Sequence, residues 1–153
     1  TDSHLHDFHW RGERFGLPDP EFDEERVVDE RTVTLKELGL SIKDRLEYVY
    51  DFGDGWEHVL TVEQVLEAGE HQTPVCLKGA RSCPPEDCGG AWGYENLLDI
   101  LKDPTHEEYE EWKTWLPENF DPEQCDLAEV NRALSVKQWT LSPSSKKGRR
   151  KKV

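Results

Sequence analysis

An alternating pattern between residues 46 and 65 constrains the fold of this chain more than any other feature. Every second residue in its first half is apolar or aromatic, namely Leu46, Tyr48, Tyr50 and Phe52. The sequence Gly53-Asp54-Gly55 then provides residues that tight turns favour, and residues 56–65 alternate again. Period-two alternation on both sides of such a turn predicts a β-hairpin.

The segments before the hairpin carry weaker signals. Residues 5–10 alternate in the same way and predict a strand. Residues 12–29 are rich in Gly, Pro and acidic residues, which predicts a connection without regular structure. Residues 32–40 are typical of a short helical turn with Thr32 as its cap.

After the hairpin, a long Gly- and Pro-rich loop is expected over residues 67–93, followed by three amphipathic helices. Their start signals are an apolar stripe from Tyr94, a capping box of Thr105 with Glu108, and an Asp121 cap followed by Pro122. Strands followed by helices predict an α+β fold. We expect a small antiparallel sheet with a central hairpin (about 46–65), packed against the C-terminal helices.

Charge divides the chain into two parts. The 153 residues include 33 acidic and 19 basic ones, for a net charge of -14. Six of the basic residues lie together in the tail: Lys146, Lys147, Arg149, Arg150, Lys151 and Lys152. We therefore expect a single acidic α+β domain over 1–141, rich in aromatic residues for its core, and a disordered basic tail over 142–153.

The charge distribution also limits the partners. An acidic body repels phosphate backbones, so contact with nucleic acid is expected only through the tail, if at all. The alternatives for the tail are a solubilising role and folding back onto the body. No stretch approaches the roughly 18 apolar residues of a membrane helix, and no secretory signal is visible, so we expect a cytoplasmic protein without membrane contact.

The loop over residues 84–90 is the first candidate binding segment. Two prolines and two glycines surround Glu86 and Asp87, so the backbone would hold both carboxylates in a defined direction. This pattern favours a site for a cation or for a basic group of a partner. The alternative is a structural turn in which the two carboxylates accept backbone hydrogen bonds and cap the helix near Tyr94.

The hairpin turn is the second candidate. Asp51, Asp54, Glu57 and His58 lie within eight residues, so oxygen and imidazole ligands could converge there. The alternative is a plain hairpin tip, with His58 as a hydrogen-bonded core residue. We expect this turn and the 84–90 loop to lie side by side. The predicted surface comprises Asp51, Asp54, Trp56, His58, Glu86, Asp87 and Tyr94.

The cysteines offer a separate metal hypothesis. Cys76, Cys83 and Cys88 lie within thirteen residues and could bind zinc with His106, His71 or Cys125 as the fourth ligand. The repeated Cys-x-x-Cys spacing that is typical of zinc sites is absent. Reduced structural thiols and a disulfide are the alternatives.

Several motifs resemble those of a known family. The matching segments are residues 4–8, 48–58, 83–90 with Gly93-Tyr94, 103–108 and 120–122. In this order they resemble the plasmid pRiA4b ORF-3-like family, bacterial and archaeal proteins that recur on plasmids and insertion elements. The resemblance implies an α+β fold and an accessory role without a defined mechanism. It also makes the Pro-Pro-Glu-Asp and Gly-Gly elements more characteristic than the flanking cysteines.

The chain departs from that family at its start. Family members usually open with a strand and a helix before the segment that begins here at His4, so we expect a fragment or a truncated member. The loss of these elements would expose a sheet edge and part of the core. A second chain or a partner would then cover the exposed surface.

Two functional hypotheses follow. Nucleophile elbows, phosphate-binding loops and the His-Glu-x-x-His motif are all absent, so we assign no catalytic residue. The leading hypothesis is a non-enzymatic accessory or binding protein of mobile-element context, which presents its acidic loops to a protein partner or to a second copy, with a divalent cation such as zinc as a candidate ligand. The alternative is a metal-dependent enzyme of hydrolase type that uses the Asp51–His58 and Glu86–Asp87 carboxylates.

Overall fold

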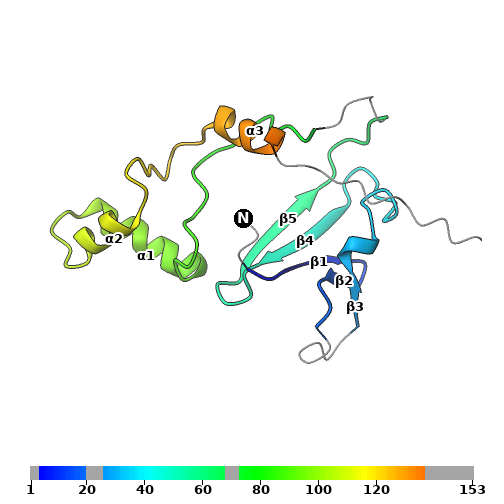
Figure 1. The fold of residues 1–153 in the computed structure, drawn as a ribbon, viewed down its shortest axis with the longest axis horizontal. Coiled ribbons are helices and arrows are strands. Elements are labelled where there is room, and N and C mark those ends of the chain that lie inside the picture. The colour runs from blue at the N-terminus through cyan, green and yellow to red at the C-terminus, as the bar shows by residue number, and fades with distance from the viewer. Residues whose placement is uncertain (1–3, 20–25, 68–72, 137–153) are drawn as a thin grey trace, which may run out of the picture.

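The computed structural model describes residues 4–19, 26–67 and 73–136 (Figure 1). Its strands are β1 (His6–Trp10), β2 (Glu13–Gly16), β3 (Val27–Asp29), β4 (Arg45–Tyr50) and β5 (Trp56–Thr61). A 3-10 turn, η1 (Glu30–Thr32), follows β3, and the helices are α1 (Gly90–Lys102), α2 (Tyr109–Trp115) and α3 (Leu127–Val136). The predicted α+β class is confirmed.

The five strands form one sheet in the order β3-β2-β1-β4-β5. β1 lies at its centre and pairs antiparallel with both β2 and β4, whereas β2 and β3 are parallel. The predicted hairpin is β4 and β5, in which Tyr48 faces His58 and Tyr50 faces Trp56. The sheet is therefore mixed, and the hairpin forms one edge of it.

Strands β2 and β3 lie within residues 12–29, so the prediction of a connection without regular structure was wrong there. These strands have only four and three residues. Phe15 is the one large apolar side chain of β2, and it is buried. Segments this short do not show a period in the sequence. Pairing with β1 stabilises β2, and pairing with β2 stabilises β3.

The helix and turn boundaries differ from the predicted ones because other side chains accept the backbone hydrogen bonds at these positions. Asp103 Oδ1 accepts hydrogen bonds from the backbone N–H and the hydroxyl of Thr105, so Thr105 forms a turn instead of a capping box. Asp126 caps α3 by accepting from two backbone N–H groups of its first turn, whereas Asp121 stabilises an earlier turn through Glu123 N–H. The predicted helical turn near residue 35 is capped by Thr34 rather than by Thr32.

Buried apolar side chains occur in two places. Phe15 and Leu46 are buried on the sheet. Leu97 and Ile100 of α1 and Leu116, which follows α2, are buried in the helical part. Helices α1 and α2 lie beyond the β4–β5 turn rather than over the face of the sheet (Figure 1). No helix in the described ranges is long and apolar enough to cross a membrane.

Candidate functional site

The β4–β5 turn is built around the side chain of Asp51. This residue adopts a positive φ of 55°, and its Oδ1 accepts hydrogen bonds from the backbone N–H of Gly53 at 3.0 Å and of Asp54 at 3.3 Å. Its own backbone N–H donates to Leu5 O at 2.9 Å. The Asp51 side chain is only 11% exposed. The turn is therefore rigid and holds one carboxylate close to the chain segment before β1.

The 84–90 loop packs directly against this turn. Gly89 N–H donates to Asp54 Oδ2 at 3.2 Å, and Gly90, with a φ of 66°, approaches the Asp54 backbone carbonyl so closely that a Cβ there would collide with it. The Tyr50 hydroxyl donates to Glu86 Oε2 at 3.0 Å. These contacts confirm the prediction that the acidic turn and the acidic loop lie side by side.

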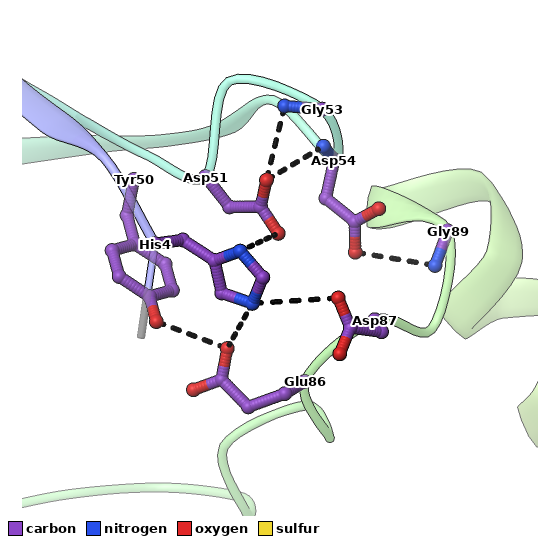
Figure 2. Close-up of polar contacts among 8 residues, drawn as sticks. All are labelled: His4, Tyr50, Asp51, Gly53, Asp54, Glu86, Asp87 and Gly89. Carbon is purple, nitrogen blue, oxygen red and sulfur yellow. Dashed lines mark hydrogen bonds and ion pairs between the residues drawn. The ribbon is translucent and has the colours of Figure 1, made fainter. Parts of the chain in front are cut away.

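The imidazole of His4 lies between the two segments (Figure 2). Its Nδ1 is 3.6 Å from Asp51 Oδ2, and its Nε2 is 3.6 Å from Glu86 Oε2 and 3.3 Å from Asp87 Oδ1. The edge of the ring also contacts Tyr50, with ring centroids 5.9 Å apart. Carboxylates from two distant parts of the chain thus converge on one imidazole. We call His4, Asp51, Glu86 and Asp87 the His4 cluster.

The His4 cluster offers a set of metal ligands. One ligand atom each from His4, Asp51 and Asp87 lie within 4.8 Å of one another, the one such group of three or more found among the described residues. An imidazole nitrogen with two carboxylate oxygens suits zinc or manganese. Exposure rises from the buried Asp51 to Asp87, whose side chain is 71% exposed. Water or a partner group can therefore approach from the side of Asp87.

The remaining predicted surface residues divide into two groups. Trp56 and Tyr94 contact each other edge to face, with ring centroids 6.4 Å apart, and join the hairpin to α1. Burial is the largest cause that raises the pKa of the Tyr94 hydroxyl. His58 is exposed on β5 and lies against Tyr48 at 5.4 Å between ring centroids. It therefore belongs neither to the core nor to the His4 cluster.

The structure does not bring the predicted zinc ligands together. The four cysteines are free thiols, and none belongs to a metal-ligand group among the described residues. His106 uses its Nδ1 to accept from Glu108 N–H at the start of α2. Burial, together with the charge of Asp54, raises the pKa of the Cys88 thiol, which disfavours the thiolate that zinc requires. His71 and the tail residues 146–152 lie outside the described residues.

His4 is the one cluster residue that sequence reasoning did not select. Its partners are at least 47 positions away in the sequence, so no local spacing connects them. A signal was nevertheless present. Counting back by two from His6 in β1 assigns His4 to the side of the sheet that bears Tyr50, the residue whose ring it contacts.

The fold and the site define an α+β protein with a histidine–carboxylate cluster beside the edge hairpin. Residues 1–129 match the family described as plasmid pRiA4b ORF-3-like protein. The uncharacterized protein y4hQ of Sinorhizobium fredii is 36% identical over 135 residues, which are 88% of this chain and 70% of that protein. The crystal structure of MM3350 from Methanosarcina mazei, a protein of unknown function, has a TM-score of 0.72 and 35% identity, covering 84% of this chain and 74% of the other. The chain therefore belongs to the plasmid pRiA4b ORF-3-like family.

Proposed function

We propose that this chain is a non-enzymatic accessory protein of mobile-element context whose His4 cluster binds a divalent cation and presents it, with the surrounding carboxylates, to a protein partner. One observation carries the proposal: an imidazole with carboxylates from two distant segments within 3.3 to 3.6 Å. Three carboxylates held this close repel one another, and a cation among them offsets that repulsion. The family's name refers to a plasmid, which supports the mobile-element context.

The exposure of the cluster supports binding to a partner. The Asp87 side chain is 71% exposed, whereas that of Asp51 is 11% exposed. The cation would therefore be held by Asp51 on its buried side and remain accessible on the side of Asp87. The net charge of -14 attracts partners with a basic surface and accelerates their encounter. The basic tail adds contact with nucleic acid under this proposal, and deletion of residues 146–152 should then abolish salt-sensitive retention on DNA.

The test is cation binding by protein purified without a histidine tag. Titration calorimetry with zinc and with manganese should show about one equivalent bound. His4→Gln and Asp87→Asn should each weaken the affinity at least tenfold, because each removes a ligand. The matched control is Asp99→Asn, which neutralises an exposed carboxylate of α1 that is paired with Lys102 and lies outside the cluster.

Two results would contradict the proposal. The first is wild-type protein that takes up neither metal in stoichiometric amount. The second is an equal loss of affinity in Asp99→Asn, which would show general attraction of cations to an acidic surface.

A second candidate is a metal-dependent hydrolase, and the exposure of Asp87 is the observation that favours it. A catalytic metal keeps a coordination position for water, and the open side of the cluster would leave one. In that case the metal-loaded protein should hydrolyse an activated ester or phosphoester, and His4→Gln should abolish the activity. Cation binding without hydrolysis of either substrate favours the binding protein.

A further inference from the structure

The two nitrogens of the His4 imidazole face different members of the His4 cluster. Nδ1 lies 3.6 Å from Asp51 Oδ2, whereas Nε2 lies 3.3 Å from Asp87 Oδ1 and 3.6 Å from Glu86 Oε2 (Figure 2). A neutral imidazole carries one proton, so one nitrogen donates it and the other presents a lone pair. The lone pair therefore faces a carboxylate unless a cation lies between them. The position of the proton decides on which side of the ring a cation can bind.

The two sides of the ring differ in their number of carboxylates. Asp51 faces Nδ1, whereas both Glu86 and Asp87 face Nε2. A cation at Nε2 would therefore meet two negative charges as well as the imidazole nitrogen, and the proton on Nδ1 would be directed at the one carboxylate on the other side. The opposite arrangement would place a proton before two carboxylates and the cation before one. The distribution of charge around the ring thus favours a cation at Nε2.

The contacts of Asp51 suit an acceptor for the imidazole N–H. Its Oδ1 accepts hydrogen bonds from the backbone N–H groups of Gly53 and Asp54, so Oδ2 is the oxygen that is directed at His4. The turn thereby fixes the carboxylate before any cation binds. Histidines that bind metals commonly donate their other ring N–H to a carboxylate, which sets the tautomer and the orientation of the ring. Asp51 is placed to do this for His4.

Glu86 is oriented by a hydroxyl group from the same strand end. The Tyr50 hydroxyl donates to Glu86 Oε2 at 3.0 Å, and the Tyr50 ring contacts the His4 ring edge to face, with centroids 5.9 Å apart. Tyr50 is the last residue of β4 and directly precedes Asp51 in the chain. Two consecutive residues thus restrain the imidazole and one of the carboxylates that face its Nε2.

We propose that the cation binds at Nε2 of His4, together with Glu86 and Asp87. Asp51 is then a positioning residue, which accepts the Nδ1 proton and holds the cation on its buried side through the imidazole rather than as a direct ligand. On cation binding, the 3.6 Å separation between Nδ1 and Asp51 Oδ2 should shorten to a hydrogen bond. Tyr50 is a second positioning residue, which restrains Glu86. This inference rests on the proposed function, because it places the cation that the proposed function assigns to the cluster.

The test is an NMR experiment on the full chain, purified without a histidine tag, labelled with ¹⁵N-histidine and loaded with zinc. Long-range ¹H–¹⁵N correlations identify the nitrogen that binds the metal, and the His4 signals are those that His4→Gln lacks. We expect zinc at Nε2 and the proton on Nδ1. Zinc at Nδ1 with the proton on Nε2 would overturn the inference but leave the proposed cation site standing. Because a nitrogen and oxygen site binds zinc more tightly than manganese, protein that takes up no zinc would contradict the proposed function as well.

Asp51→Asn tests the first positioning role. The substitution keeps the Oδ1 acceptor of the turn but places an amide N–H group opposite His4 Nδ1, which favours the imidazole proton on Nε2. The same NMR correlations of the metal-free variant should show this tautomer, and its zinc affinity should fall at least tenfold. A proton that stays on Nδ1 in the variant would overturn the role of Asp51. Circular dichroism verifies that the variant folds, and the spectrum of the zinc-loaded wild type decides the inference if it does not.

Tyr50→Phe tests the second positioning role, because it removes the hydroxyl but keeps the ring beside His4. Zinc affinity should fall about tenfold while zinc stays at Nε2 of His4. The matched control is Tyr109→Phe in α2, outside the cluster, which should bind zinc like the wild type. Equal affinities of Tyr50→Phe and this control would overturn the role of Tyr50.

Discussion

Two histidine–carboxylate clusters of this protein differ in where their members come from. The Asp7 cluster lies within the sheet: Asp7 Oδ1 is 3.0 Å from His9 Nε2, and its Oδ2 accepts from the Arg14 guanidinium of the neighbouring strand. The His4 cluster instead joins the segment before β1, the hairpin turn and the 84–90 loop. One cluster depends on strand pairing and the other on tertiary contacts.

The two clusters also differ in how far their carboxylates are exposed to solvent. The Asp7 side chain is 5% exposed, and partners from two adjacent strands occupy both of its oxygens. Such a group stabilises the fold and offers no access to a ligand. In the His4 cluster, Asp87 is 71% exposed and the ion-pair distances are 3.3 to 3.6 Å. The His4 cluster, which is the more exposed of the two, is therefore the one that we propose for binding.

The largest expected effect comes from separating the two segments of the His4 cluster. Gly90→Ala places a Cβ against the Asp54 carbonyl at a position with a positive φ of 66°. We expect it to lower the free energy of unfolding by about 3 kcal/mol, the sum of overpacking and backbone strain. Urea denaturation measures this change.

The matched control for Gly90→Ala is Gly39→Ala. Gly39 has a similar φ of 62°, but open space surrounds the position of its Cβ. This variant carries the backbone strain alone and should cost about 1 kcal/mol. Equal losses in the two variants would show that the close approach of Gly90 to the hairpin turn contributes nothing to stability.

The next largest expected loss of stability comes from a substitution in the Asp7 cluster. Asp7→Asn preserves the shape of the side chain but removes the negative charge that Arg14 and His9 face. We expect a loss of about 2 kcal/mol in the free energy of unfolding, less than for a fully buried pair because Arg14 is 31% exposed and can reach water. Asp99→Asn, in an exposed pair, should change it by less than about 0.5 kcal/mol. A similar effect of both substitutions would contradict a structural role for Asp7.

The same contrast explains what the sequence could reveal. Alternation predicts the β4–β5 hairpin because strong local patterning and a Gly-Asp-Gly turn coincide there. The proximity of Asp54 to the 84–90 loop was predicted on the assumption that one aromatic interior brings the two acidic segments together, and the Gly89 N–H bond to Asp54 confirms it. The hairpin thus follows from local patterning, whereas the proximity of turn and loop was assumed and had no local signal.

Features that depend on tertiary contacts were not accessible in the same way. His4 becomes a cluster residue only when β1 and β4 pair and bring it to Asp51, more than forty positions away. The short strand β2 depends on its neighbours β1 and β3 for its hydrogen bonds. Cap positions were missed because several Asp and Thr residues compete at each helix start, as at Asp121 and Asp126.

A small stability effect is expected for His4→Gln in the absence of metal. His4 is partly exposed, at 28% of its side chain, and its ion pairs are longer than good hydrogen bonds. The free energy of unfolding should therefore change by less than about 0.5 kcal/mol, in contrast to Asp7→Asn. A loss as large as that of Asp7→Asn would show that the His4 cluster holds the fold together, which would remove the distinction between the two clusters.

The smallest expected effect is a difference in labelling rate between two cysteines near Asp87, which reports on the packing of the loop. Cys88 is buried with 4% of its surface exposed, and burial, followed by the charge of Asp54, raises the pKa of its thiol, whereas Cys83 is exposed. Because the thiolate is the reactive form, a raised pKa leaves less of it at about pH 8. Iodoacetamide should therefore label Cys83 well before Cys88, as mass spectrometry of the labelled peptides would show, and labelling of Cys88 should become faster as the pH rises.

The same labelling measures which residues keep this loop in place. His4→Gln should leave the slow labelling of Cys88 unchanged, because the hydrogen bond between Gly89 and Asp54 remains. Gly90→Ala should accelerate it, since the Cβ pushes the loop away from the turn. If His4→Gln accelerated labelling as much as Gly90→Ala, the imidazole would be a structural link between turn and loop. Its carboxylate partners would then be explained without any cation.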